Sequence, residues 1–501
     1  MDESMGKFLS DFAALVELAQ AQGPRGPQGE QLVPILSAHL GRPAHEIPVV
    51  LEQVPSHRFV DLDIFLAGEA GKDPAARLVG IGGGDQRHHL SLSDMLQQQQ
   101  FFPRLPLSQP DYTNVAVGPD AQRQALALGV WLFTRDGVPL AVLQRTASPQ
   151  YGRMTASLEV LSPDPGATAA FLAELRRQLQ SDSVLKGQVI SLTMDDFGQG
   201  SAGVTFHHRP ALGEADVILP EGLLQKISDH AVGVAAHRAA LKALGQHLKR
   251  GILLYGPPGT GKTHTVRYLL GRTGGTTAIL LSGGTLAFVS EAARMARALQ
   301  PSLVVLEDCD LIAEDRSYGH GPQPLLFEVL DAMDGLDDDA DVTFVLTTNR
   351  VDMLERALAE RPGRVDLAVN IPLPSERERI ELLRLYSRRI RFSEEALAAA
   401  AARIEGTTAS FVRELVRRAV LGAQLAGADV SDEHLEAAVA ELMADGATLT
   451  RSLLGSQHSP GSPAGQGYPP EPGLAPGPGF FPGPGGPPGG WSALGSVGDS
   501  R

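Results

Sequence analysis

The chain has 501 residues, a net charge of −15 and an isoelectric point near 5.4, and 43% of its residues are apolar. This length suggests about three domains. The acidic balance argues against a surface that wraps nucleic acid, because phosphate contacts need clustered lysine and arginine. The single cysteine, Cys309, excludes an intramolecular disulfide and a multi-cysteine metal site. No apolar run reaches the roughly 18 residues of a membrane span, and the N-terminus lacks the features of a signal peptide. We therefore expect a soluble, cytoplasmic protein.

The first 110 residues predict a small helical or mixed module that ends in a linker. Apolar residues recur at helical spacing over residues 7–22 and 31–40, and a breaker rich in glycine and proline follows the first of these stretches. Residues 97–110 combine a glutamine run with several prolines, which indicates a linker. Nothing in this module identifies a function.

Residues 120–215 predict a compact α+β domain that would bind a substrate or a partner. Two apolar, β-rich runs over residues 125–133 and 138–145 are separated by Asp136-Gly137, which is a strong signal for a hairpin turn. A strand, a helix and a second strand are expected over residues 154–161, 167–179 and 188–192.

Two histidine pairs occur in this half of the chain. His88-His89 and His207-His208 stand next to each other rather than four residues apart, and no thiolate or carboxylate cluster accompanies them. We interpret them as solvated loop or strand-edge residues rather than metal ligands.

A phosphate-binding pattern begins at Gly256. The stretch to Thr263 reads Gly-Pro-Pro-Gly-Thr-Gly-Lys-Thr; an apolar run precedes it and a stretch with helical spacing follows, which is the strand, loop and helix order of a P-loop. Successive backbone N–H groups and the helix N-terminus would hold an anion, Lys262 would reach the outer phosphates, and the Thr263 hydroxyl would bind Mg²⁺. A chance glycine-proline turn explains this pattern poorly. The predicted ATP-binding residues are Gly256, Pro257, Pro258, Gly259, Thr260, Gly261, Lys262, Thr263 and His264.

A second strand supplies the carboxylates that such a site needs. Residues 302–306 are apolar and rich in β-branched side chains, and Glu307 and Asp308 follow them directly. In a parallel sheet the carboxyl end of this strand lies beside the P-loop. The alternative is a strand that simply ends in a solvated acidic turn.

A third strand and an arginine pair complete the constellation. The apolar run 342–346 ends in polar residues that include Asn349, which could orient the attacking water or contact the γ-phosphate. Arg361 and Arg364 then follow close to a turn, where they are useful only if an anion faces them.

These motifs resemble an AAA+ ATPase of the classical AAA subgroup, which contains the proteasomal ATPases and the membrane-anchored AAA proteases. The resemblance covers residues 221–444 and implies an α/β P-loop subdomain over 219–374 with a helical lid over 375–445. It further implies that Thr348-Asn349 acts as sensor 1 and that Arg361 and Arg364 act as arginine fingers on a neighbouring subunit. A homo-oligomeric ring, usually a hexamer, is therefore expected.

The order of the two acids departs from the family pattern, in which aspartate comes before glutamate. By position Glu307 would hold Mg²⁺ and Asp308 would polarise the water, each with a side chain one methylene away from the usual length. This order could slow hydrolysis without abolishing it. It also resembles the acidic motif of the mitochondrial AAA translocases that move folded Rieske protein.

The resemblance also aligns residues 282–291 with the first pore loop of the family. Phe288 and Val289 would then grip a protein substrate threaded through the central pore. The alternative is that Phe288 packs against the helix behind it. Residues 314–322 would form a second pore loop by the same reasoning.

The C-terminal residues 446–501 are rich in proline and glycine, so they cannot bury enough apolar surface to offset the cost of ordering, and we expect a disordered tail.

For the whole chain we expect an Mg²⁺-dependent ATPase that remodels, unfolds or disassembles protein substrates. The alternative is a slow-turnover, nucleotide-dependent switch or scaffold. A nucleic-acid motor is disfavoured by the acidic balance.

Overall fold

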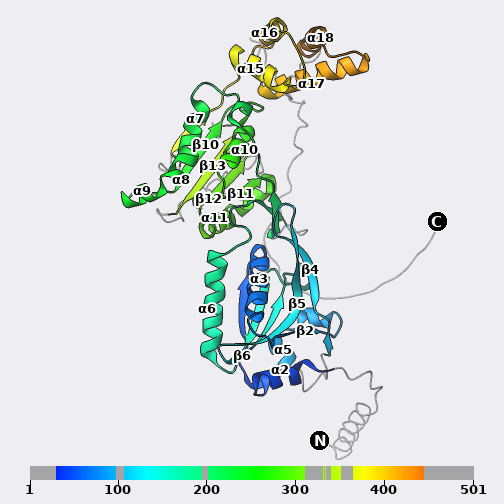
Figure 1. Cartoon of the computed structure of the whole chain (residues 1–501), viewed down its shortest axis with the longest axis vertical. Helices are drawn as coiled ribbons and strands as arrows, with labels where there is room; N and C mark the ends of the chain where they lie inside the picture. Colours follow the sequence, from blue (N-terminus) through cyan, green and yellow to red (C-terminus); the bar gives the residue numbers. More distant parts are fainter. Residues whose placement is uncertain are drawn as a thin grey trace, which may run out of the picture. The chain divides into compact units, whose positions relative to one another are not determined.

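The computed structural model describes residues 30–97, 106–194, 201–310, 331, 333, 340–350 and 365–444 (Figure 1). The expected helix over residues 7–22, the second pore loop, the arginine pair and the C-terminal tail lie outside these residues. Among the described residues, no helix combines the length and the apolar character needed to cross a membrane.

The N-terminal half is built on a seven-stranded sheet with the order β1-β7-β6-β5-β2-β3, in which β4 also pairs with β5. The neighbouring strands run antiparallel. The turn between β5 and β6 has positive φ angles at Asp136 and Gly137, so the predicted hairpin is confirmed. The strands are β1 (Val50–Val54), β2 (Arg77–Ile81), β3 (Leu107–Ser108), β4 (Asp111–Ala116), β5 (Gln122–Arg135), β6 (Val138–Arg145) and β7 (Ala156–Leu161).

Helices cover both faces of this first sheet, which explains why β7 is buried along its whole length. Phe171 from α6 packs against Phe65 from α3, with ring centroids 5.4 Å apart, and the two helices share one core with the sheet. The opposite face packs against α2 and α5 through a second core that includes Leu36 and Met95. These helices are α2 (Leu32–Leu40), α3 (Phe59–Ala70), α5 (Leu92–Gln97) and α6 (Pro165–Ser181), and a short α4 (Gln86–His89) precedes α5.

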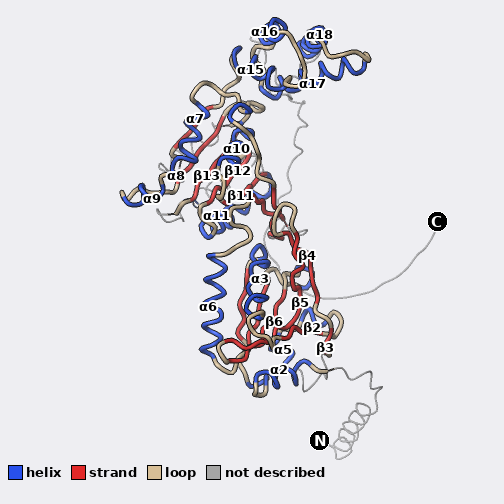
Figure 2. Tube along the Cα trace, viewed as in Figure 1, coloured by secondary structure: helices blue, strands red, loops and turns tan. Residues whose placement is uncertain are grey.

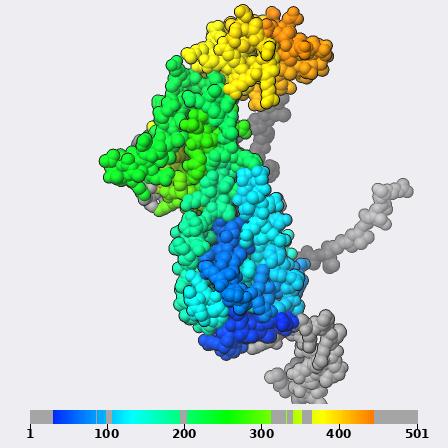
Figure 3. All heavy atoms as spheres, in the orientation of Figure 1, coloured from blue at the N-terminus to red at the C-terminus, as the bar shows by residue number. Residues whose placement is uncertain are grey.

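The structure does not have the domain boundary that we expected near residue 110. β1 pairs with β7, and β2 pairs with β5, so strands from both expected modules form one sheet. Figure 3 shows the blue and cyan segments side by side on the visible face. The sequence pattern reports only local periodicity, whereas these pairings join strands far apart in the chain.

The second sheet also has seven strands, in the order β14-β10-β13-β12-β11-β8-β9. Figure 2 labels three of them, β11, β12 and β13. The pairs from β14 to β8 are parallel, and β9 closes the edge antiparallel to β8. This confirms the predicted α/β fold with a parallel sheet. The strands are β8 (Val189–Met194), β9 (Ser201–His207), β10 (Arg250–Tyr255), β11 (Thr277–Ser282), β12 (Ser302–Glu307), β13 (Val342–Thr348) and β14 (Leu367–Asn370).

The hairpin of β8 and β9 differs from our expectation. We assigned residues 188–207 to the α+β domain, but β8 pairs in parallel with β11 and so extends the second sheet. Its apolar side chains, such as Ile190 and Leu192, enter the core of that sheet. The alternation of apolar and polar residues in a strand does not itself reveal which sheet the strand joins.

Helices cover both faces of the second sheet and bury two separate apolar cores. The covering elements include α7 (Leu223–Ser228), α10 (Lys262–Arg272) and α11 (Val289–Ala298). The short helices α8 (Val234–Ala236) and α9 (Arg238–Ala243) bury none of their own residues. Two short helical turns also matter for the site, η5 (Glu214–Asp216) and η7 (Gly283–Phe288).

A separate helical subdomain follows β14, as the predicted lid requires. Hydroxyl side chains cap three of its helices, because Ser375, Ser393 and Thr408 each accept a bond from a backbone N–H in the first turn. Its helices share one apolar core. They are α15 (Glu376–Tyr386), α16 (Glu394–Arg403), α17 (Ala409–Leu425) and α18 (Asp432–Met443).

Candidate functional site

The loop between β10 and α10 has a backbone path that requires glycine. Gly256 has a φ of 143°, and a Cβ atom there would lie 2.2 Å from the carbonyl oxygen of Ile371. Gly259 has a φ of 77°, and a Cβ atom there would lie 3.0 Å from the hydroxyls of Thr408 and Ser410. A side chain at either position would therefore force the loop to shift.

Lys262 lies at the start of α10 and reaches back over this loop. Its Nζ donates hydrogen bonds to the carbonyl oxygens of Gly256 and Pro257, each at 2.8 Å. Burial lowers the pKa of Lys262 to about 8, while the charges of Asp308 and Asp310 oppose that shift. The ammonium group is thus held inside the loop, where phosphate oxygens could replace the two carbonyl acceptors.

Thr263 and Glu307 meet beside the loop, although they come from different elements. The Thr263 hydroxyl donates a hydrogen bond to the Glu307 carboxylate at the end of β12. Burial raises the pKa of Glu307, and repulsion from Asp308 adds to the shift. A half-buried carboxylate beside a hydroxyl is a donor set that suits a hard divalent cation, which would relieve the cost of desolvating that charge.

Asp308 follows β12 in an unusual backbone conformation, with a φ of 53°. Its backbone N–H donates to the Thr347 hydroxyl at 3.0 Å, which fixes this turn against β13. Aspartate is among the few residues that tolerate positive φ, whereas glutamate is less suited to it. The backbone therefore offers a physical reason for aspartate at the second acidic position.

Asp310 is a site residue that the sequence analysis missed. Its carboxylate accepts hydrogen bonds from the Thr348 hydroxyl and the Asn349 backbone N–H, both at 3.1 Å. The Asn349 side-chain amide also lies 3.4 Å from Asp310 Oδ2 and 3.5 Å from Asp308 Oδ1. A third acid placed two residues after Asp308 was the available signal.

The expected pore residues do not both lie on the surface. Val289 is fully buried at the start of α11, and Phe288 is half-buried and packs against the same core. The alternative that we gave, in which Phe288 packs against the helix behind it, agrees with this contact. Our expectation that Val289 lines a pore is not met, because its side chain is buried. Arg361 and Arg364 lie outside the described residues.

The helical subdomain touches the loop directly. The backbone N–H of Ser410, in the first turn of α17, donates to the carbonyl oxygen of Gly259 at 3.1 Å. His264, in the first turn of α10, contacts a different segment, with its Nε2 2.9 Å from the carbonyl oxygen of Asp216. The loop and the helix that follows it are thus held by two segments outside the sheet.

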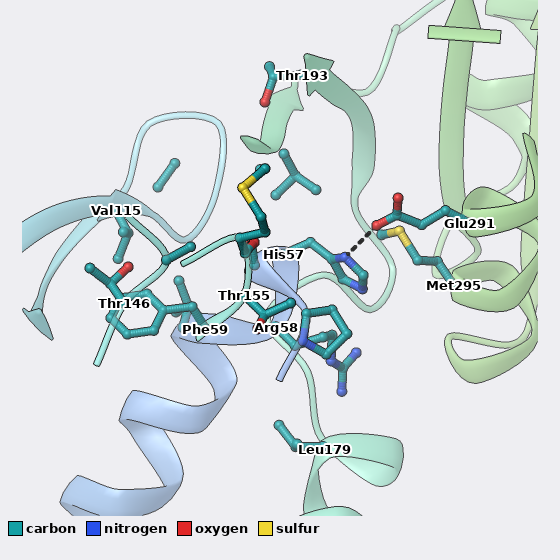
Figure 4. Close-up of a pocket in the computed structure, with 18 of the residues that line it drawn as sticks. His57, Arg58, Phe59, Val115, Thr146, Thr155, Leu179, Thr193, Glu291 and Met295 are labelled. Atoms are coloured by element: carbon teal, nitrogen blue, oxygen red, sulfur yellow. Dashed lines mark hydrogen bonds and ion pairs between the residues drawn. The ribbon is translucent and has the colours of Figure 1, made fainter. Parts of the chain in front are cut away.

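A cavity of about 1470 Å³ lies elsewhere in the described structure, and none of the predicted nucleotide-binding residues lines it. Figure 4 shows His57, which precedes α3, pointing toward Glu291 of α11, and both residues line this cavity. His57 Nδ1 lies 3.1 Å from Glu291 Oε1. This contact joins the helices of the first sheet to those of the second.

A glycine-rich loop between a buried parallel strand and a helix, with carboxylates at the ends of neighbouring strands, defines a P-loop nucleotide-binding domain. Lys262, Glu307, Asp308 and Asn349 come together at this edge, as the sequence predicted for the end of each strand.

Comparison with known proteins narrows this class. Residues 252–373 match the AAA family, the ATPase family associated with various cellular activities. The 26S proteasome regulatory subunit 8 of Caenorhabditis elegans is 32% identical over 223 residues, which are 41% of this chain and 53% of that protein. The corresponding homologue of Schizosaccharomyces pombe is 32% identical over 227 residues, 42% of this chain and 56% of that protein.

A third relative, the 26S proteasome regulatory subunit 8 homologue of Saccharomyces cerevisiae, is 34% identical over 168 residues, 31% of this chain and 41% of that protein. The chain spans about half the length of the curated relatives it matches. These matches show that residues 252–373 are an AAA domain, similar to that of the proteasomal regulatory subunits.

Proposed function

We propose that this protein hydrolyses ATP and uses the energy to remodel, unfold or disassemble protein substrates. The observation that carries the proposal is the meeting of Lys262, Glu307, Asp308 and Asn349 at one edge of the parallel sheet. This edge is where ligands bind in open α/β sheets. The relatives are regulatory subunits of a protein-degrading particle by name, which favours a motor that acts on proteins over a slow switch.

Each residue has a separate task in this proposal. The loop's N–H groups and Lys262 bind the phosphates, and Thr263 and Glu307 are the residues that would hold Mg²⁺. When bound, Mg²⁺ supplies positive charge that offsets the charge of the phosphate oxygens. Asp308 accepts a hydrogen bond from the attacking water, and Asn349 orients that water beside it.

We further propose that the protein acts as a homo-oligomeric ring, with six subunits expected, in the cytoplasm. Arg361 and Arg364 would reach the γ-phosphate bound by a neighbouring subunit. Cys309 is free and buried, as suits a reducing compartment. The domain of the first sheet would engage the protein substrate, and Phe288 would contact it in the pore.

The test is capture of substrate by an ATP-trapping variant. Asp308→Asn should bind ATP without hydrolysing it, so a tagged ring purified with ATP should retain client proteins that the Lys262→Ala ring does not. ADP in place of ATP should release those clients. If both variants retain the same proteins, or if the wild-type chain does not hydrolyse ATP in any assembled state, the proposal is wrong.

A mixing experiment tests the ring separately. Arg361→Ala and Lys262→Ala subunits are each expected to be inactive alone. Mixed rings should recover part of the ATPase rate, because an intact arginine then faces an intact P-loop. Absence of recovery in rings that demonstrably mix would place the arginine within its own subunit or outside the reaction.

A further inference from the structure

A short segment before α7 touches both parts of the nucleotide-binding region, and we call residues 213–219 the strap segment. Val217 is buried in the core of the second sheet, and Leu219 packs against the same core. Ile218, which lies between them, packs against the core of the helical subdomain instead. The strap segment therefore alternates its side chains between the sheet and the helices.

Asp216 adds a polar connection on the helical side. Its Oδ1 accepts a hydrogen bond from Nη1 of Arg388 at 2.5 Å, and Nη2 of the same guanidinium donates to the carbonyl oxygen of Ala215 at 2.9 Å. The other carboxylate oxygen accepts from the backbone N–H of Gly213 at 2.8 Å. Arg388 follows α15, so this paired contact ties the helical subdomain to the strap segment.

The backbone of Asp216 carries the connection on to the P-loop helix. His264 Nε2 lies 2.9 Å from the carbonyl oxygen of Asp216, and His264 is the residue after Thr263. If the helical subdomain rotates and displaces Asp216, this contact must break or the first turn of α10 must move. The same subdomain holds the other end of the loop through Ser410 and Gly259.

We propose that Arg388 and Asp216 form a positioning pair that couples the orientation of the helical subdomain to the phosphate-binding loop and slows nucleotide release. This inference rests on the proposed nucleotide-dependent function. While the pair is formed, the strap segment holds His264 and the subdomain holds Gly259, so the loop is restrained from both sides. Breaking the pair frees the subdomain to turn away and lets the nucleotide leave.

The chain offers a matched control for Arg388. Arg384 lies on the same subdomain, its side chain is 52% exposed like that of Arg388, and it pairs with Glu394 within the subdomain instead of with the strap segment. Arg388→Ala should increase the dissociation rate of a fluorescent ADP analogue about three- to fivefold, the effect of one exposed charge pair, while Arg384→Ala should not change it. The melting temperature of the two variants should be alike.

Two further variants separate positioning from loss of structure. Asp216→Asn added to Arg388→Ala should cause no further acceleration, because both changes remove the same contact. The charge swap, Asp216→Arg with Arg388→Asp, should restore slow release at least in part. Equal release rates for Arg388→Ala and Arg384→Ala, or additive effects of Asp216→Asn and Arg388→Ala, would overturn the coupling alone. A wild-type chain that binds no ADP analogue would overturn the proposed function and this inference together.

Discussion

The carboxylate of Asp310 contacts Asn349 twice. Its Oδ1 accepts a hydrogen bond from the backbone N–H of Asn349 at 3.1 Å, and its Oδ2 lies 3.4 Å from the side-chain amide nitrogen of Asn349. This places the amide of Asn349 within 3.5 Å of Asp308 as well. The ends of β12 and β13 are thus joined by a carboxylate that lies outside both strands. Asp310 is a positioning residue for the proposed reaction, since it acts through Asn349.

Replacing Asp310 should slow hydrolysis without preventing nucleotide binding. Asp310→Asn weakens the hold on Thr348 and Asn349, and we expect kcat to fall about 10- to 100-fold, as misplacement of a reacting group by about 1 Å can do. The KM for ATP should stay close to the wild-type value. Steady-state ATPase measurements check this, with the exposed Asp85→Asn as a control; an unchanged kcat would contradict the positioning role.

Asp308 can be exchanged for asparagine more safely than for glutamate. Asparagine tolerates the φ of 53°, so Asp308→Asn should keep its melting temperature while losing hydrolysis. Asp308→Glu places a longer side chain in a left-handed backbone conformation and should cost about 1 kcal/mol of unfolding free energy. Thermal unfolding and ATPase rates distinguish the two. If Asp308→Glu is as stable as the wild type, the backbone does not explain the order of the acids.

The affinity for ATP should depend on the charge of Lys262. Because burial lowers the pKa of this lysine to about 8, the ammonium form is complete below that pH and is lost as the pH rises through it. Binding of phosphate favours the charged form, so affinity should weaken above pH 8 by up to about tenfold per pH unit, as for linkage to one proton. Titration calorimetry between pH 7 and pH 9.5 measures this. Lys262→Ala should remove the slope, and a flat wild-type profile would contradict the prediction.

The segment before α11 can be tested by comparing two neighbours. Val289 is fully buried, so Val289→Ala should lower the unfolding free energy by about 1–3 kcal/mol through the lost apolar contacts. Phe288→Ala should destabilise the fold less than the loss of a fully buried phenylalanine would, because Phe288 is only half-buried. If its ring contacts substrate, the same change should reduce the stimulation of the ATPase by an unfolded protein. Stimulation that is unaffected by Phe288→Ala would leave this residue a packing role only.

The sequence predicted the P-loop, the two acids and Asn349 because each motif is local and lies where a strand ends. Asp310 was missed because its role depends on a neighbour in another strand, Asn349 of the β13 turn, and not on a motif of its own. The pairings of β1 with β7 and of β8 with β11 were missed for the same reason. Hydrophobic periodicity identifies a strand but does not indicate which other strand pairs with it.

Removal of β8 and β9 should destabilise the nucleotide-binding region. A fragment that begins at Arg209 would expose the edge of β11, with its unpaired backbone groups and the apolar surface that Ile190 and Leu192 cover. We expect this fragment to aggregate or to melt at a lower temperature than one that begins at Ser183. Size-exclusion chromatography and thermal unfolding of the two fragments check this, and equal behaviour would show that the hairpin is dispensable.

The family match begins at residue 252, yet the sheet that carries the site begins its hydrogen bonding at β8, more than one element earlier. Two of its strands are therefore supplied by a part of the chain that has no counterpart in the match. A chimaera in which a relative's domain replaces the residues from 252 onward would have to fit its own edge strand against β8 of this chain. Changes in β11 and in the β8–β9 hairpin are therefore expected to be coupled, because the two pair directly.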